Sequence, residues 1–283
     1  MTDLAPVLQG FFTDRLDDIV ALCHQHRYQM NEVARCAQVV LGITAASTRS
    51  AGAVALVDLG TGAGLGLQVD RYQYRVGTAT HGPDEPGLSL ACEARGPIPP
   101  PAVHLPPISL RVGVDLDPVD LADPAARAWL WACAPPEASA LSRLAAAMDI
   151  ARRHPATMIA GDAVDVLPRV LAGIPPQQRI IVVDAYTAVF LPPQRRAELA
   201  GALAEAARGR PVTWVSLDPL VPLGPAGRDS VQGVALPPAL IRDYQQGGVF
   251  AVLGVRTFDE VGDRSRLLAR AHPSGQWIEW LGP

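Results

Sequence analysis

Apolar residues recur at helical spacing between residues 12 and 46, and the stretch from Arg15 to Leu41 contains neither glycine nor proline. This pattern predicts a helix that stops near Gly42. Farther along, short apolar runs typical of buried strands alternate with segments of helical periodicity. The predicted strands are 53–59, 110–116, 157–160, 179–183, 212–217, 249–257, 265–271 and 276–281, and the predicted helices begin at 65 and 123 and cover 139–153, 164–172 and 193–208.

The alternation of strands and helices predicts an α/β fold with a doubly wound parallel sheet. The strands after residue 249 are predicted to form an antiparallel edge of that sheet. Residues 75–109 interrupt the pattern with eight prolines, and we interpret them as an irregular, proline-rich insertion. We therefore predict two parts, a small N-terminal helical cap over residues 1–50 and one larger domain over residues 51–283.

Composition narrows the range of functions. The chain has 283 residues, of which 49% are hydrophobic and 18% charged, so a sizeable core is expected. The net charge of −4 gives no reason to expect nucleic acid or an anionic membrane as a partner. The chain contains no lysine, which excludes the Walker A lysine of phosphate-loop ATPases and a Schiff-base lysine.

The cysteine spacing and the N-terminal sequence bear on metal binding and on location. The four cysteines, at positions 23, 36, 92 and 133, form no CxxC pair, so neither a zinc site nor a disulfide framework is predicted, and we expect no metal. The first residues lack the basic and apolar regions of a secretory signal, and no apolar run reaches the length of a membrane span. We expect a cytoplasmic protein.

The densest chemical signal is the segment Asp58-Leu59-Gly60-Thr61-Gly62-Ala63-Gly64, which lies between a predicted strand and a predicted helix. Closely spaced glycines let the backbone turn tightly and approach a ligand. In an open α/β sheet, ligands bind at the carboxyl ends of the strands, where this loop would lie. The dinucleotide fingerprint GxGxxG does not fit, because Leu65 or Leu67 occupies the place of its third glycine.

Acidic residues also lie at the ends of the three following strands of the predicted parallel sheet. A carboxylate at the end of the second strand can accept hydrogen bonds from both ribose hydroxyls of a nucleoside. The strand-end residues are Asp115 and Asp117 after the second strand, Asp162 and Ala163 after the third, and Asp184 and Tyr186 after the fourth.

The acidic-x-G-x-G-x-G loop and the strand-end acids together resemble class I S-adenosylmethionine (SAM) dependent methyltransferases over about residues 53–220. The resemblance implies a Rossmann-like sheet of seven strands, a catalytic domain over residues 51–283 and SAM as the cofactor. It also implies that Asp115, or as a second choice Asp117, binds the ribose, and that Asp162 contacts the adenine. The implied cofactor-binding set is Asp58, Gly60, Thr61, Gly62, Gly64, Asp115, Asp117, Asp162 and Ala163.

A closer resemblance is to a bacterial family of unknown function that looks like a branch of the same superfamily. It is carried by four segments, 31–36, 70–74, 111–115 and 129–133, and implies no particular reaction. This chain departs from the family pattern in a shorter helical region before Asn31 and in the absence of a Trp-Pro-Asp sequence after Cys133. Both departures concern the substrate side.

Polar residues on the first predicted helix are candidates for the substrate side. Tyr28, Asn31, Glu32 and Arg35 recur at helical steps and could lie over the mouth of the cleft or form a solvated helix face. In the first case Glu32 could hold a substrate or the amine of SAM, and Arg35 a carboxylate. Arg71 could also bind a carboxylate or a phosphate, although it could equally attach the insertion to the sheet.

The function favoured by these features is methyl transfer from SAM to an oxygen or nitrogen of a small molecule. Asp184 is the first candidate for the base that takes the acceptor's proton, Glu32 is the second, and Tyr186 is an orienting hydroxyl. Two alternatives stay open: a protein that binds SAM without methyl transfer, and a nicotinamide oxidoreductase. The expected partner is a small-molecule substrate, with no nucleic acid or membrane, and a homodimer is an option because a short cap leaves apolar surface uncovered.

Overall fold

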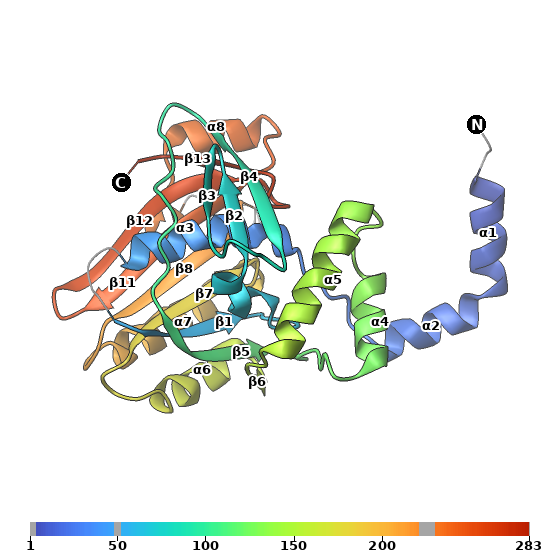
Figure 1. Cartoon of the computed structure of the whole chain (residues 1–283), viewed down its shortest axis with the longest axis horizontal. Helices are drawn as coiled ribbons and strands as arrows, with labels where there is room; N and C mark the ends of the chain where they lie inside the picture. Colours follow the sequence, from blue (N-terminus) through green and yellow to red (C-terminus); the bar gives the residue numbers. More distant parts are fainter. Residues whose placement is uncertain (1–3, 48–51, 221–229, 283) are drawn as a thin grey trace.

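The computed structural model describes residues 4–47, 52–220 and 230–282, and its main element is a mixed sheet of eleven strands in the order β3-β2-β4-β13-β12-β11-β8-β7-β1-β5-β6 (Figure 1). The five strands from β8 to β6 are parallel, and β11 and β12 are antiparallel to their neighbours. The strands are β1 Val54–Leu59, β2 Gln73–Val76, β3 Ala79–His81, β4 Ser89–Arg95, β5 Ile108–Asp115, β6 Thr157–Ala160, β7 Arg179–Ala185, β8 Val212–Pro219, β11 Ala251–Asp259, β12 Gly262–Ala271 and β13 Trp277–Trp280, with β9 Ser230–Val231 and β10 Val234–Ala235 forming a separate pair.

Helices cover both faces of the sheet. The α-helices are α1 Ala5–Asp14, α2 Leu16–Gln25, α3 Cys36–Ser47, α4 Pro124–Ala132, α5 Ala138–Arg153, α6 Ala163–Ala172, α7 Pro193–Ala206 and α8 Pro238–Gln245, and the 3₁₀ helices are η1 Val33–Arg35, η2 Leu65–Arg71 and η3 Ala188–Phe190.

Over the described ranges, no helix has both the length and the apolar character needed to cross a membrane.

Alternate residues of β1 explain the layering, because successive side chains of a strand point to opposite faces. Val54 and Leu56 belong to the core under α3 and α5, whereas Ala55 and Val57 belong to the core under α6 and α7 (Figure 1). The mixed α/β sheet with helices on both faces agrees with the predicted fold class. The predicted strands at 157–160, 179–183 and 212–217 are confirmed within a few residues.

The predicted number of seven strands is wrong, because the described residues form eleven in one sheet. Much of the difference comes from residues 73–95, most of which we interpreted as irregular insertion. They form β2, β3 and β4, and inward-facing Leu90 and Cys92 give β4 an alternating burial pattern. Since β4 pairs with β13, the C-terminal strands lie inside the sheet and β3 forms the edge. Residues 96–107, like the connections 77–78 and 82–88, lie outside these strands.

The single helix predicted over 12–46 is also interrupted. α2 ends at Gln25, the chain is not helical over 26–32, and α3 continues past the expected stop at Gly42. That glycine instead allows close packing, because a Cβ there would lie 2.4 Å from Cγ1 of Val215. α1 and α2 bury no residue and project away from the sheet (Figure 1). The division of the chain at residue 50 stays a prediction.

Candidate functional site

Four parallel strands end side by side, which brings the predicted loops together. Leu59 at the end of β1 is paired with Val114 of β5 and with Asp184 of β7, and Asp115 is paired with Ala160 at the end of β6. The carboxyl ends of these strands therefore lie next to one another, and this row of strand ends is the usual place for a ligand in this type of fold.

The glycine loop has a conformation that explains its sequence. Gly60, Gly62 and Gly64 have φ angles of 69°, 55° and 72°, in the left-handed region that favours glycine. Neighbouring side chains also leave no space for a Cβ. One on Gly60 would lie 2.0 Å from Oγ1 of Thr187, and one on Gly62 would lie 2.6 Å from Oδ1 of Asn31. The loop is thus tightly enclosed on two sides.

Asp115 fixes the loop to the end of β5. The N–H of Gly62 donates to its Oδ2 at 2.8 Å, and the N–H of Asp117 donates to its Oδ1 at 3.0 Å. Each carboxylate oxygen keeps capacity for a second hydrogen bond. Asp115 lines a large cavity, whereas Asp117 is exposed and does not. The geometry therefore favours Asp115 over Asp117 as the predicted ribose-binding residue.

The large cavity has a volume of about 570 Å³, within the range of small-molecule sites. It lies over the strand ends and brings together seven of the predicted site residues, which come from both the cofactor and the substrate groups. These are Tyr28, Arg35, Gly60, Asp115, Asp162, Ala163 and Tyr186.

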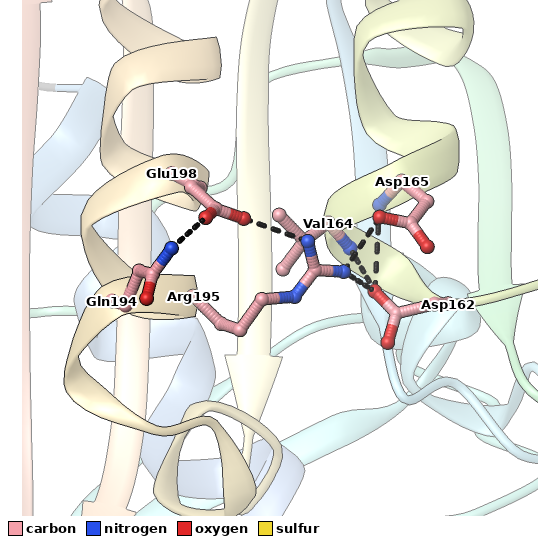
Figure 2. A network of polar contacts seen from close by, with 6 residues as sticks. All are labelled: Asp162, Val164, Asp165, Gln194, Arg195 and Glu198. Carbon is pink, nitrogen blue, oxygen red and sulfur yellow. Dashed lines mark hydrogen bonds and ion pairs between the residues drawn. The ribbon is translucent and has the colours of Figure 1, made fainter.

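Asp162 is held by a network that includes an arginine absent from our predictions (Figure 2). Its Oδ1 accepts from the N–H of Val164 at 2.9 Å, which caps α6, and from Nη2 of Arg195 at 2.6 Å. Arg195 also pairs with Asp165 at 2.6 Å and with Glu198 at 2.7 Å. In the described part of the chain, Oδ2 of Asp162 has no hydrogen-bond donor. One oxygen is thus fixed and the other is available.

Asp58 lies beneath the glycine loop and is buried. Thr61 donates to its Oδ2 at 2.8 Å. Burial, together with the nearby carboxylates of Asp184 and Asp115, nevertheless raises the pKa of Asp58 to about 7 against the opposing effect of the Thr61 hydrogen bond. A predicted cofactor residue is therefore a carboxyl group that titrates near neutral pH.

A second, smaller cavity of about 70 Å³ lies against Asp58 and Thr61. Asn31 lines it and accepts from the N–H of Ala63 at 3.4 Å, while its buried Nδ2 has no partner among the described residues. Glu32 lines it too. The Oε1 of Glu32 accepts from the N–H of Ala34 at 3.0 Å and caps η1. Both residues from the Asn-Glu segment therefore lie at this cavity and not on a solvated helix face.

Tyr186 has a strained backbone, with a φ of 68°. For a residue other than glycine, this conformation costs on the order of 1–2 kcal/mol. Its ring lies 3.7 Å from the Cζ atom of Arg35, and its buried hydroxyl makes no hydrogen bond within the described ranges. Burial raises the pKa of the Tyr186 hydroxyl to about 12. Strain of this kind gathers at binding and catalytic sites.

Asp184 does not have the accessible position that we expected for a base. Its side chain is 1% exposed and lines neither of the two cavities. Oδ1 accepts from the N–H of Ala188 at 3.0 Å, and Oδ2 accepts from Nε1 of Trp214 at 2.7 Å. The carboxylate holds the turn after β7, which carries Tyr186.

Arg71 is not brought to the site. It donates through Nε to Oε1 of Gln68 at 3.1 Å, at the end of η2, and lines neither of these cavities. The alternative structural interpretation of this residue fits better. Nor does any group of three or more His, Cys, Asp and Glu side chains suited to a metal ion occur across residues 4–47, 52–220 and 230–282.

The family of the chain follows from a sequence model. The model described as "Uncharacterized protein conserved in bacteria (DUF2332)" matches residues 1–280, so the chain belongs to this family. None of the curated proteins matches the sequence.

Several solved structures are similar at low identity. The YcgJ protein from Bacillus subtilis matches at 14% identity with a TM-score of 0.30, over 66% of this chain and 53% of YcgJ, so the match spans about half of that protein. SAM-bound CalS10, an amino pentose methyltransferase from Micromonospora echinaspora, matches at 14% identity over 89% of this chain and 79% of its own, with a TM-score of 0.26. The sugar N-methyltransferase KedS8 from Streptoalloteichus matches at 15% identity over 88% of this chain and 74% of its own, with a TM-score of 0.28. At such TM-scores these similarities carry no argument about function.

Proposed function

We propose that this member of the DUF2332 family binds SAM in the 570 Å³ cavity and transfers its methyl group to an oxygen or nitrogen of a small molecule. One observation carries the proposal. Gly60, the first glycine of the loop, and two strand-end carboxylates, Asp115 and Asp162, line the same cavity although they come from three different strand ends. Carboxylates and bare backbone at such an edge suit a nucleoside with a polar chain.

The adenosine half of SAM fits the acidic side of the cavity. Asp115 has acceptor capacity on both oxygens for the two ribose hydroxyls, and Oδ2 of Asp162 can accept from the exocyclic amine of adenine. Leu116, directly after the ribose acid, presents an exposed apolar side chain to the cavity and can cover the base.

The methyl-transfer half lies toward Tyr186. SAM supplies an activated methyl group on a sulfonium, so the chain mainly aligns the acceptor with the methyl carbon. Asp184 acts in this proposal as a positioning residue, because it fixes the turn that carries Tyr186. Glu32 is the remaining base candidate, and its Oε1 already accepts from Ala34 and faces Arg143 at 3.5 Å.

Binding of SAM without methyl transfer is a second candidate, and the enclosure of Asp184 favours it. A transferase that deprotonates its acceptor needs an accessible base. If Glu32 is occupied by its own contacts, the cavity would hold the cofactor but lack that base. Incubation of the protein with SAM and panels of small alcohols, phenols and amines separates the two candidates through the release of S-adenosylhomocysteine.

Ligand-induced stabilisation tests the proposal. We expect SAM and S-adenosylhomocysteine to raise the melting temperature, and NAD and NADP to leave it unchanged. A ligand at one hundred times its Kd adds about 2.7 kcal/mol to the free energy of unfolding. A shift with NAD or NADP alone would favour the nicotinamide alternative, and no shift with any of the four would remove the proposal.

A further inference from the structure

Arg35 is a buried cation at the boundary between the two cavities. It lies in η1, is 8% exposed and lines both cavities. Its Nε donates to the carbonyl of Pro273 at 2.7 Å, its Nη2 lies 3.1 Å from Sδ of Met30, and its Cζ lies over the Tyr186 ring. All of these partners are neutral.

No carboxylate in the described part of the chain forms an ion pair with Arg35. The nearest acid in sequence, Glu32, instead faces Arg143 at 3.5 Å and caps η1. A buried charge is strongly unfavourable unless it is paired. The lack of solvent lowers the pKa of Arg35, and guanidinium groups nevertheless stay charged in proteins. Glu32 acts on this charge electrostatically, but no described carboxylate forms a direct ion pair with the guanidinium.

The geometry leaves part of this guanidinium free. Nε and Nη2 have partners, whereas Nη1 makes no hydrogen bond to any described residue, and the side chain forms part of both cavity walls. The ring of Tyr186 covers one face of the group and fixes its plane. A planar guanidinium held in this way presents an edge that suits a carboxylate.

The carboxylates that line the large cavity form no ion pair with Arg35. Asp115 accepts from the loop, and Asp162 accepts from Arg195. Near Arg35 the wall of the large cavity includes Met30, Tyr28 and Tyr186, which carry no charge. A ligand group beside Arg35 would therefore meet a cation without an ion-pair partner, next to aromatic and apolar surface.

We propose that Arg35 is a receptor for a carboxylate carried by a bound small molecule. The inference rests on the proposed function for its setting, and two sources of the carboxylate are compatible with it: the amino-acid end of SAM and the methyl acceptor. In the second case the acceptor is a carboxylic acid with an apolar or aromatic body.

Two pairs of probes distinguish the sources. S-adenosylhomocysteine and 5′-methylthioadenosine share a nucleoside, and only the first carries a carboxylate. Benzoate and benzamide have the same shape, and only the first is charged. Calorimetry is done on the full chain for both pairs, with benzoate and benzamide tested alone and in the presence of 5′-methylthioadenosine.

We expect the wild type to bind the charged member of at least one pair at least tenfold more tightly. In Arg35→Met this preference should fall below threefold, and a cooperative thermal transition without ligand checks that the variant is folded. Arg35→Lys should keep part of the preference. Arg71→Met, which removes the arginine that lies away from the cavities, should keep all of it.

Each result decides the question. If Arg35→Met loses the preference for S-adenosylhomocysteine over 5′-methylthioadenosine, Arg35 binds the carboxylate of SAM. If it loses the preference for benzoate over benzamide, Arg35 binds the carboxylate of the methyl acceptor. The inference is overturned if the wild type distinguishes neither pair, or if Arg35→Met retains the preference. The two proposals fail separately: if neither nucleoside binds, the proposed function fails, and benzoate alone still tests Arg35.

Discussion

The two ends of the large cavity differ in how their polar groups are satisfied. At one end, Asp115 and Asp162 accept hydrogen bonds from the backbone and, in the second case, from Arg195. At the other end, Arg35 has no counter-ion and the hydroxyl of Tyr186 has no partner in the described chain. The polar groups of the first end are held within the protein, whereas those of the second end keep unused hydrogen-bonding capacity.

Asp58 lies beneath the glycine loop, against the smaller cavity, and its titration is the largest expected effect. Its pKa is about 7 in the folded state, against 3.8 as the ordinary value. The folded protein therefore holds this proton more tightly than the unfolded chain. The stabilising contribution is complete below about pH 4 and is lost as the pH rises to about 7, by about 4 kcal/mol.

Asp58→Asn stays neutral and should lack this loss. Urea unfolding between pH 4 and pH 8 measures it as the difference in the free energy of unfolding between the wild type and the variant. Asp184, whose pKa burial also raises, interacts electrostatically with Asp58, so the difference reports the titration of Asp58 together with this interaction. A constant difference across this range would mean that Asp58 is ionised in the folded state.

The first end makes the next prediction. Asp115→Ala removes both ribose acceptors and the acceptor for the N–H of Gly62. Hydrogen bonds to a charged group contribute about 1.5–3 kcal/mol each, so affinity for S-adenosylhomocysteine should fall by about two orders of magnitude or more. Calorimetry measures it, with Asp117→Asn as the comparison, since that exposed carboxylate is expected to change affinity by less than threefold. The opposite ranking would identify Asp117 as the ribose acid.

A third prediction tests how tightly the loop is enclosed. In Gly62→Ala, the new Cβ would meet Oδ1 of Asn31 at 2.6 Å and the backbone would keep a φ of 55°. We expect the free energy of unfolding to fall by about 2 kcal/mol. Asn31→Ala in the same chain should recover the steric part and leave the conformational part. If the double variant recovers nothing, Asn31 does not restrict the loop.

The sequence predicted the first end better than the second. Parallel strands bring their carboxyl ends to one edge, so the acids after the first three strands could be grouped without any knowledge of packing. The same rule failed for Asp184, because a strand end does not reveal that Trp214, 30 positions later, covers the carboxylate. Strand-end position locates a group along the edge but does not determine its exposure.

Errors near the N-terminus had a different cause. The segment 26–32 has helical periodicity and no breaker, yet it is not helical. His26 stacks on Trp129 at 4.5 Å, and Nε1 of Trp129 donates to the carbonyl of Arg27 at 2.7 Å. These tertiary contacts outweigh local propensity. They also bring Tyr28 and Arg35 to the cavity, which a continuous helix would not require.

Arg195 provides the finest test of the comparison, because it contributes to the organisation of the first end without lining the cavity. It fixes Oδ1 of Asp162 at 2.6 Å and leaves Oδ2 for the adenine amine (Figure 2). The N–H of Val164 holds the same oxygen, so Arg195→Met should loosen the carboxylate only partly. We expect a three- to tenfold loss of affinity for S-adenosylhomocysteine, equivalent to about 1 kcal/mol. The inosine analogue, which lacks the amine, should lose less affinity, so calorimetry of both ligands should show a smaller preference for adenosine.

Glu198→Gln is the matched control, since Glu198 contacts Arg195 but not Asp162. If both ligands weaken equally in Arg195→Met, the arginine stabilises the α6–α7 contact and has no part in recognition of the base.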